Sequence, residues 1–563
     1  MKSRASTLLI YAGPLVTLSM TPWFSDNPFI IKFVLLVSLA FYAAGLVLPD
    51  FIKSLSARRN HFVLLISCLI FLGLTIPIFF SGAPFLQQFY GTPTRITGYV
   101  TYISLLLFFI VGSTLRTPRF HEKLVFGFIL TGCLNGLYGL LQFFKLDPVP
   151  WENDWVVGTL GNPDFYSTFM GLATIACFAM LLDSKKNTKD RIITILVFIL
   201  TFFSALTSNS NQGIVVAGIG CAVVSYYFIR SNSYLSRFRY FYLVCVGLIF
   251  LAGFFGSIGK GPLSNFLYKG SIAARGDYWR AGARMFHYAP FSGIGLDSYV
   301  DWFRRARDMR AIGHFGATLF SDAAHNVLID LSAGGGLLLI VGYLFLTFFA
   351  LYCGLTSLRR EITFNPVLNA IFAIWLGYQI DTVISINQLG LAIWGWIFSG
   401  VLVAYRFSSP EIPGVTVKKN KKSNFQSNDD ILPGFLGIIG LGCGFVISIP
   451  MFIADVGWKA AITSGLPDRI IASAKAFPQN GPRLSLAALN LGNNGLTAEA
   501  RDLLLTALHN NPDDYEAWVT YYSIPGISVE EKSRALKEAR RLDPLNPDPK
   551  LGPLTKTPSW KYG

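Results

Sequence analysis

Apolar stretches of about 18–22 residues recur along most of this chain. An α-helix rises about 1.5 Å per residue, so roughly 20 apolar residues are needed to cross the ~30 Å hydrocarbon core of a bilayer. Inside that core every backbone N–H and C=O group must be paired within the protein, so each stretch is expected to be helical. We identify about thirteen such stretches, near residues 5–24, 29–48, 62–80, 96–115, 124–144, 165–182, 192–207, 212–229, 240–256, 326–353, 366–385, 388–405 and 431–453. The sequence therefore predicts an all-α, polytopic membrane helix bundle.

The positive charge of the chain is distributed unevenly between its loops. A formal net charge of +15 would suit a nucleic-acid-binding protein if the cations formed one patch. With the N-terminus cytoplasmic, however, the loops on that side hold about 22 Lys and Arg residues, and the short loops opposite hold about three, namely Lys32, Arg95 and Lys145. This is the positive-inside rule. The charge thus predicts a bilayer rather than a nucleic acid as partner, with the long loop 257–325 and the C-terminal tail extracytoplasmic.

Cysteine usage gives no sign of a disulfide framework or of a metal site. All seven cysteines lie in predicted spans, and the chain contains no Cys-x-x-Cys and no paired His/Cys spacing. We therefore expect neither a metal nor another cofactor.

The C-terminal tail has a different composition from the rest of the chain. Beyond Pro450 it becomes polar and rich in Ala, Leu and Asn, which predicts a membrane domain (1–453) followed by a helical domain (454–563). Prolines at 478, 512 and 544 are spaced by 34 and then 32 residues, near the tetratricopeptide period of 34. The spacing favours a short α-solenoid of degenerate repeats over an unrelated helical tail. Such repeats bind partner proteins or hold neighbouring domains.

The long loop 257–325 carries cations and a histidine beside the membrane. The cations that we single out are Lys269, Arg275, Arg280 and Arg284. Guanidinium groups make bidentate contacts to phosphate, and His325 is of the residue type best suited to move a proton near neutral pH. If 275–287 is helical, Arg280 and Arg284 share one face and Arg275 lies off it. The loop therefore predicts chemistry on a phosphorylated lipid at the outer membrane face.

Other polar residues are more ambiguous. Gly-Asn-Pro-Asp at 161–164 is by itself an ordinary helix start, in which Asn162 or Asp164 is a cap. Asp381 lies near the outer end of a predicted span, where lining a site and snorkelling to the surface are equally plausible. The dense cations of 304–310 are expected on lipid headgroups or in solvent; they are Arg304, Arg305, Arg307 and Arg310.

The order of these motifs resembles that of the O-antigen ligase and O-antigen polymerase superfamily, which includes bacterial O-oligosaccharyltransferases. The resemblance covers roughly 80–405, and a subset of the family has a similar tetratricopeptide tail. Its motifs lie at 87–100, 138–151, 157–170, 207–213, 275–295, 324–336 and 379–400. The resemblance implies metal-independent transfer of a glycan from an undecaprenyl-diphosphate-linked donor to a hydroxyl acceptor, at the outer face of the bacterial inner membrane.

The family residues map unevenly onto this chain. The family histidine falls on His325, followed by Asn326, and the family arginine before Pro-x-x-Gly-x-Gly falls on Arg275. The Gly-Asn-Pro-Asn element falls on 161–164, with Asp164 in place of the second Asn. Where many members have Ser-Arg-Gly, with an arginine implicated in diphosphate binding, this chain has Asn211. The cations considered as replacements are Arg95, Arg280 and Lys260.

These assignments give each candidate residue a role. His325 is the expected catalytic base, and three arginines are expected to bind the donor diphosphate: Arg275, Arg280 and Arg95. Four residues are expected to line the site: Asn162, Asp164, Arg284 and Asn326. The acceptor is a lipid, a growing glycan or a protein, so a polymerase of lipid-linked repeat units and a protein O-oligosaccharyltransferase remain alternatives. A lipid-linked-glycan transporter would not need His325, and a non-catalytic assembly protein would act through its repeats.

Overall fold

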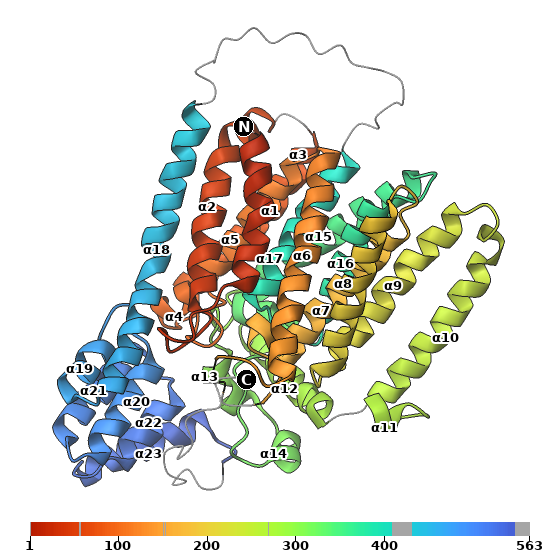
Figure 1. Cartoon of the computed structure of the whole chain (residues 1–563). Coiled ribbons are helices and arrows are strands. Elements are labelled where there is room, and N and C mark those ends of the chain that lie inside the picture. Colours follow the sequence, from red (N-terminus) through yellow and green to blue (C-terminus); the bar gives the residue numbers. More distant parts are fainter. Residues whose placement is uncertain are drawn as a thin grey trace.

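The computed structural model describes residues 2–55, 58–149, 151, 154–267, 270–407 and 431–546. Within these ranges the protein is all-helical, without a β-strand (Figure 1). Lys269 lies outside the described residues. The long helices of the bundle are α1 (Lys2–Leu18), α2 (Ile30–Lys53), α3 (Arg58–Phe80), α5 (Tyr99–Thr114), α6 (Pro118–Phe143), α7 (Pro163–Leu181), α8 (Thr188–Thr207), α9 (Gln212–Ser231), α10 (Arg239–Ser257), α15 (Val327–Arg360), α16 (Pro366–Asp381), α17 (Leu389–Arg406) and α18 (Ile431–Ser464).

Each of the predicted apolar stretches is a helix, but not every helix is long enough to count as a span. Ten helices in the described residues are long and apolar enough to cross a membrane: α2, α3, α6, α7, α8, α9, α10, α15, α17 and α18. The chain is therefore a multi-pass membrane protein. The helices α1, α5 and α16 contain only 16 or 17 residues, or about 24–26 Å of helix. The predicted count of about thirteen spans is thus not confirmed.

Shorter helices gather at one end of the bundle. They are α4 (Phe85–Tyr90), α11 (Ser264–Leu267), α12 (Gly270–Tyr288), α13 (Tyr299–Ala306) and α14 (Met309–Phe315), with 3-10 turns η1 (Gly158–Leu160) and η2 (Ser236–Phe238) elsewhere in the chain. Figure 1 shows α4 and α11–α14 at the end of the bundle opposite the N-terminus. The long loop predicted from the sequence therefore folds mainly into helices that cover one end of the membrane bundle.

The C-terminal helices lie at this same end. They are α19 (Pro467–Ala474), α20 (Gly481–Asn493), α21 (Thr497–Asn510), α22 (Tyr515–Ser523) and α23 (Val529–Leu542), and they enclose a second apolar core (Figure 1). The 34 residues of α18 make about 51 Å of helix, more than one bilayer core. Its last turns supply Trp458 and Ala461 to the C-terminal core. One continuous helix thus runs through the predicted boundary at 453/454, and the assignment of α19–α23 as tetratricopeptide repeats stays a prediction.

The helix α15 is broken near its start, and a loop packs into the break. Gly336 has φ +71° and ψ −168°, outside helical geometry. The N–H of Leu337 instead donates to the carbonyl of Pro290 at 2.7 Å, and the N–H of Gly295 donates to Gly334 at 3.1 Å. A Cβ atom at Gly336 would lie 2.5 Å from the carbonyl oxygen of Phe291. Glycine at this position therefore lets the segment after α12 approach the backbone of α15.

Candidate active site at the loop-bearing end of the bundle

The loop between α4 and α5, which bears Arg95, is held by two carboxylates of the long loop. The guanidinium of Arg95 binds both oxygens of Asp322, with an Nε–Oδ2 distance of 2.8 Å, and the Arg95 side chain is 7% exposed. Asp297 fixes the same loop by accepting from the N–H of Thr92 at 2.6 Å and from the hydroxyl of Thr97 at 3.2 Å. The structure thus joins Arg95, as the predicted outer-border cation, to the segment that leads to His325.

His325 lies just before α15, in a left-handed backbone conformation with φ +51°. Asn326 follows it as the N-cap of α15, and its side chain accepts from the N–H groups of Leu328 at 3.0 Å and Ile329 at 3.2 Å. The Oδ1 atom of Asn326 therefore caps the start of α15, and its role in lining the site stays a prediction. The imidazole stacks beside the ring of Tyr278, with centroids 5.7 Å apart, and stays partly exposed. This leaves His325 anchored but accessible.

The surroundings of His325 keep its imidazole neutral. Burial lowers its pKa to about 4, the positive charges of Arg95 and Arg275 act in the same direction, and the carboxylate of Asp322 opposes them. Burial would raise the pKa of the Asp322 carboxyl, but the neighbouring Arg95 guanidinium outweighs it, so that pKa lies below its usual value. At neutral pH the site therefore contains a free imidazole able to accept a proton, beside an ionised carboxylate that would stabilise the protonated form.

Arg275 meets the Gly-Asn-Pro-Asp motif across the bundle. Its Nη2 atom lies 3.5 Å from Oδ2 of Asp164, and its side chain is 12% exposed. Asp164 also accepts from the Ser210 hydroxyl at 2.6 Å, while Asn162 caps α7 by accepting from the N–H of Asp164 at 2.8 Å. The motif is thus both the helix start that its sequence suggests and a contact of the candidate phosphate ligand.

The position that lacks the family arginine is close to this cluster. Asn211 is the N-cap residue of α9, and Ser210 before it is linked through Asp164 to Arg275. Of the three cations considered as replacements, Arg95 is bound to Asp322, Arg280 is bound to Asp308, and Lys260 is exposed. The structure therefore brings Arg275 itself to the segment where a second arginine was expected.

Arg280 and Arg284 share one face of α12, as expected, and both contact Asp308. The Nε of Arg280 lies 2.9 Å from Asp308, and it also pairs with Asp277 one turn back. Arg284 donates to Asp308 at 3.3 Å and to the carbonyl of Ala306 at 2.9 Å. The hydrogen bond from Arg280 holds the pKa of Asp308 at about 2. These arginines are 37% and 50% exposed and bind the loop to α12.

The expectation that Arg304, Arg305 and Arg307 lie on lipid headgroups or in solvent is wrong. The three side chains bind carboxylates of the C-terminal helices; the pairs are Arg304–Glu516 at 2.8 Å, Arg305–Asp513 at 2.7 Å and Arg307–Asp543 at 2.7 Å. Their partners lie more than 200 residues away in sequence, so a local charge run gave no sign of them. Arg310 is exposed, as expected.

Asp381 is buried and faces inward rather than snorkelling. Its side chain accepts from the Thr168 hydroxyl at 2.7 Å, and the residue is 2% exposed. Thr168 lies one helical turn after Asp164 on the same face of α7. Asp381 therefore belongs to the polar cluster around the start of α7.

Two hollows border these residues, and a third lies beside them. A pocket of about 120 Å³ is lined by Arg95, Asn162 and Asp322 and, from the C-terminal part, by Asp455 and Arg483. A smaller one, of about 40 Å³, is also lined by Arg95 and Asp322. A third hollow, of about 1010 Å³, has no arginine in its lining and is mostly apolar.

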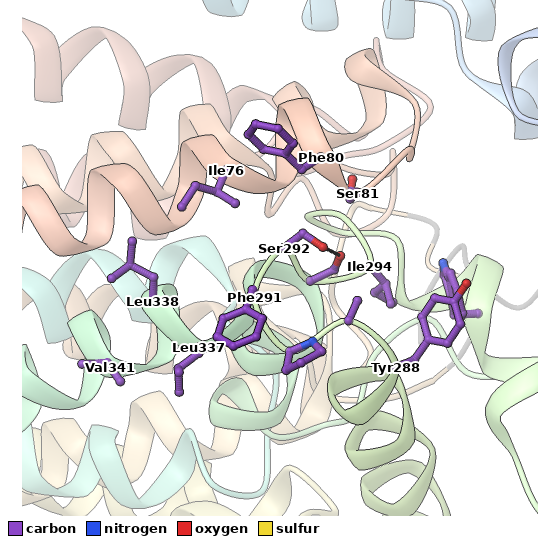
Figure 2. A pocket seen from close by; sticks show the side chains of 14 residues that line it. Ile76, Phe80, Ser81, Tyr288, Phe291, Ser292, Ile294, Leu337, Leu338 and Val341 are labelled. Atoms are coloured by element: carbon purple, nitrogen blue, oxygen red, sulfur yellow. Dashed lines mark hydrogen bonds between the residues drawn. The ribbon is translucent and has the colours of Figure 1, made fainter.

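Figure 2 shows this apolar groove between α3 and α15, with Phe291 from the intervening turn beside Leu337. Ile294 lines both this groove and the smaller pocket beside Arg95. The groove and the pocket beside Arg95 are therefore neighbours, with Ile294 between them.

Sequence reasoning missed Asp297 and Asp322, the two carboxylates that hold the Arg95 loop. Both stand next to motif residues, Asp297 after Gly-Ile-Gly-Leu and Asp322 three residues before His325. Their position beside the motifs was the one feature of the sequence that could have marked them as site residues. Among the described residues, no group of three His, Cys, Asp or Glu side chains is placed to hold a metal ion.

Comparison with known proteins supports the resemblance drawn from the motifs. Residues 196–344 match a family model described as O-Antigen ligase. The match runs from α8 into α15 and includes Arg275 and His325, while Arg95, Asn162 and the C-terminal helices lie outside it. No curated protein matches the chain. The chain thus contains a segment similar to the O-antigen ligase family model within a multi-pass helical bundle.

Proposed function

We propose that this member of the O-antigen ligase superfamily transfers a glycan from undecaprenyl diphosphate to a hydroxyl acceptor. The observation that carries the proposal is the partly exposed imidazole of His325, kept neutral by burial and by the charges of Arg95 and Arg275, where the chain re-enters the bundle as α15. A neutral base beside fixed positive charges suits the attack of a hydroxyl group on a sugar whose leaving group is an anionic diphosphate.

The reaction needs one proton transfer and one displaced diphosphate. The acceptor oxygen forms a bond to the anomeric carbon as the bond from that carbon to the donor phosphate oxygen breaks, and undecaprenyl diphosphate leaves with the electron pair. His325 takes the proton of the acceptor hydroxyl, and the ionised Asp322 stabilises the resulting imidazolium. A guanidinium neutralises the charge that develops on the departing phosphate oxygen.

Among the arginines, Arg275 is best suited to neutralise the charge on the departing phosphate. Its contact with Asp164 is long, at 3.5 Å, whereas Arg95 is bound by both oxygens of Asp322. A weakly held guanidinium can exchange its carboxylate for a diphosphate at smaller cost. We assign Arg275 to the donor diphosphate, and Arg95 to the electrostatics of His325.

The apolar groove of Figure 2 is a suitable place for a long hydrocarbon chain. Its walls come from α3 and α15, two helices apolar enough to span a membrane. Ile294, one of its lining residues, also lines the pocket beside Arg95. We place there the apolar tail of a lipid substrate, with its polar head toward the arginines.

The acceptor defines the remaining alternatives. A lipid, a growing glycan or a protein hydroxyl would each be activated by the same base, which leaves ligase, polymerase and protein O-oligosaccharyltransferase as variants of one chemistry. A lipid-linked-glycan transporter would require the arginines but not a general base. We place the site on the extracytoplasmic face of the bacterial inner membrane, since the Lys/Arg-rich loops lie at the opposite end of the bundle.

The decisive experiment replaces His325 by Gln in the purified full-length protein. Glutamine keeps a polar side chain of similar reach but does not take up the proton, so transfer should fall by about a hundredfold to ten-thousandfold. The measurement is the release of undecaprenyl diphosphate and the labelling of acceptor, using lipid-linked oligosaccharide extracted from the source strain. Exposed His287 in the same loop provides the matched control, and His287→Gln should keep its activity.

Retention of most transfer activity by His325→Gln, with donor binding unchanged, would refute the assignment of a base. It would favour the transporter instead.

A further inference from the structure

Arg307 lies where the long loop meets the C-terminal helices. Its Nη2 donates to both carboxylate oxygens of Asp543, at 2.7 and 2.8 Å, and its Nη1 donates to the carbonyl of Leu319 at 2.6 Å. The side chains of Arg307 and Asp543 are both 0% exposed. Removal of one member of such a pair leaves an uncompensated buried charge, so the two elements are held together specifically.

Neighbouring contacts extend this junction. Arg304 donates to Glu516 at 2.8 Å, and its guanidinium lies 4.3 Å from the ring centroid of Tyr515 and 5.8 Å from that of Phe320. The cations of α13 and the carboxylates of the C-terminal helices thus form a complementary, largely desolvated interface.

Two connections lead from Arg307 to the candidate site. The first runs through the next residue, Asp308, which accepts from Arg280 at 2.9 Å and Arg284 at 3.3 Å and so fixes α12, the helix that carries Arg275. In the second, Arg307 holds the carbonyl of Leu319, in the stretch between α14 and α15.

This stretch contains both Asp322, the partner of Arg95, and His325. It has no helix of its own, so its conformation depends on tertiary contacts such as the one from Arg307.

We infer that Asp543 is a positioning residue for the proposed glycan transfer. Through Arg307 it fixes both the arginine helix α12 and the segment with Asp322 and His325, so the C-terminal helices complete the site rather than serve only to recruit a partner. This inference rests on the proposed function. It assigns to the C-terminal part, which lies outside the matched family segment, a direct effect on the geometry of catalysis.

The test is Asp543→Asn in the full-length protein. Asparagine keeps the size of the side chain but removes the charge, so Arg307 stays buried without its anion and the two connections loosen. We expect kcat/KM for the lipid-linked donor to fall at least tenfold. Asp502→Asn is the matched control, because Asp502 pairs with Lys475 in the same C-terminal helices but is 64% exposed. Its activity should stay within twofold of the unmodified protein.

The pH profile separates positioning from simple loss of folded protein. If 319–325 loses its anchor, His325 becomes better hydrated and the acid limb of kcat/KM moves from about pH 4 toward the ordinary value near 6.5. Loss of folded protein alone would lower the amount of active enzyme and leave the acid limb unchanged. An unchanged acid limb in Asp543→Asn, at any residual activity, would overturn the inference.

A milder variant covers the case in which Asp543→Asn does not fold. Glu516→Gln removes the charge of a half-exposed partner of Arg304 and should shift the acid limb in the same direction by a smaller amount. No shift in that variant would also overturn the inference. The proposed function fails by a different result, namely unreduced transfer in His325→Gln, so the two failures are distinguishable.

Discussion

At the scale of single residues, His325 shows how the fold changes the pKa of a side chain that transfers protons. An exposed histidine would be half protonated near pH 6.5. Burial beside two arginines lowers the pKa of His325 to about 4 in this site, with Asp322 as the one neighbour that opposes the shift. A base of this kind is fully available at neutral pH, although its affinity for a proton in the resting state is small.

The resting pKa of His325 predicts the pH dependence of transfer. Neutral imidazole is the active form and its pKa is lowered, so activity should stay constant from about pH 8 to pH 5.5 and fall only as the pH approaches about 4. The dependence of kcat/KM on pH reports the free enzyme and is the measurement to make. In the kcat profile the anionic donor should move the acid limb upward. Half-loss of kcat/KM near pH 6.5 would contradict the burial of His325.

Arg275 permits a second test at this scale. Arg275→Ala should reduce kcat/KM for the donor by roughly tenfold to a hundredfold, since hydrogen bonds to charged groups contribute about 1.5–3 kcal/mol. Arg275→Lys should recover only part of this, because an ammonium group lacks the planar fork of the guanidinium. Turnover of donor by both variants is measured against Arg310→Ala, which removes an exposed arginine of the same loop. Equal rates for Arg275→Ala and Arg310→Ala would remove Arg275 from the donor site.

The residues that could be predicted from sequence are those that belong to a motif or that interact with residues close to them in the chain. His325 and Arg275 stood in motifs with a fixed order, and the cap at Asn162 follows from a four-residue pattern. Asp543 and Asp297 could not be found in this way. The partner of Asp543 is Arg307, 236 residues away, and the partner of Asp297 is the loop that bears Arg95, about 200 residues away. In a single sequence nothing distinguishes these carboxylates from other acidic residues near a helix end.

At the scale of elements, hydrophobicity located the helices but did not show their interruptions. Length and apolarity identified the helical segments because both are set by the bilayer. The break in α15 depends instead on a contact with 290–295, and the glycines at 334–336 could equally have been a close helix-packing site. The short helix α16 has 16 residues and is buried along most of its length, so its apolar sequence is explained by packing against other helices as well as by a bilayer.

The break in α15 should be sensitive to a single methyl group. At Gly336 an added Cβ would meet the Phe291 carbonyl oxygen at 2.5 Å, and φ +71° with ψ −168° is a region essentially restricted to glycine, which costs another residue about 1–3 kcal/mol. Gly336→Ala should therefore lower the thermal unfolding midpoint in detergent and widen or displace the groove of Figure 2. Gly247→Ala on α10, where the Cβ would meet nothing within 4 Å, should leave the midpoint unchanged or raise it. Equal midpoints for the two variants would mean that the 290–295 turn does not pack into α15 as described.

At the scale of the whole molecule, the helices of the long loop and the C-terminal helices occupy the same end of the bundle (Figure 1). This arrangement agrees with the distribution of charge, since the loops rich in Lys and Arg lie at the opposite end of the bundle. The contact between α13 and the C-terminal helices also requires both parts to be in one compartment. Charge, helix direction and the buried Arg307–Asp543 pair are thus three independent constraints on one topology.

Reporter fusions test this topology directly. A fluorescent protein fused after Lys422 should be bright and alkaline phosphatase at the same position inactive, because the positive-inside rule places that loop in the cytoplasm. Fusions after Asn546 should give the reverse pattern, because α18 is long enough to cross the bilayer and enter the C-terminal core. The paired reporters control for expression at each site. A bright fluorescent fusion after Asn546 would place the C-terminal helices in the cytoplasm, and because Asp543 holds Arg307, it would place the candidate site there as well, out of reach of an extracytoplasmic acceptor.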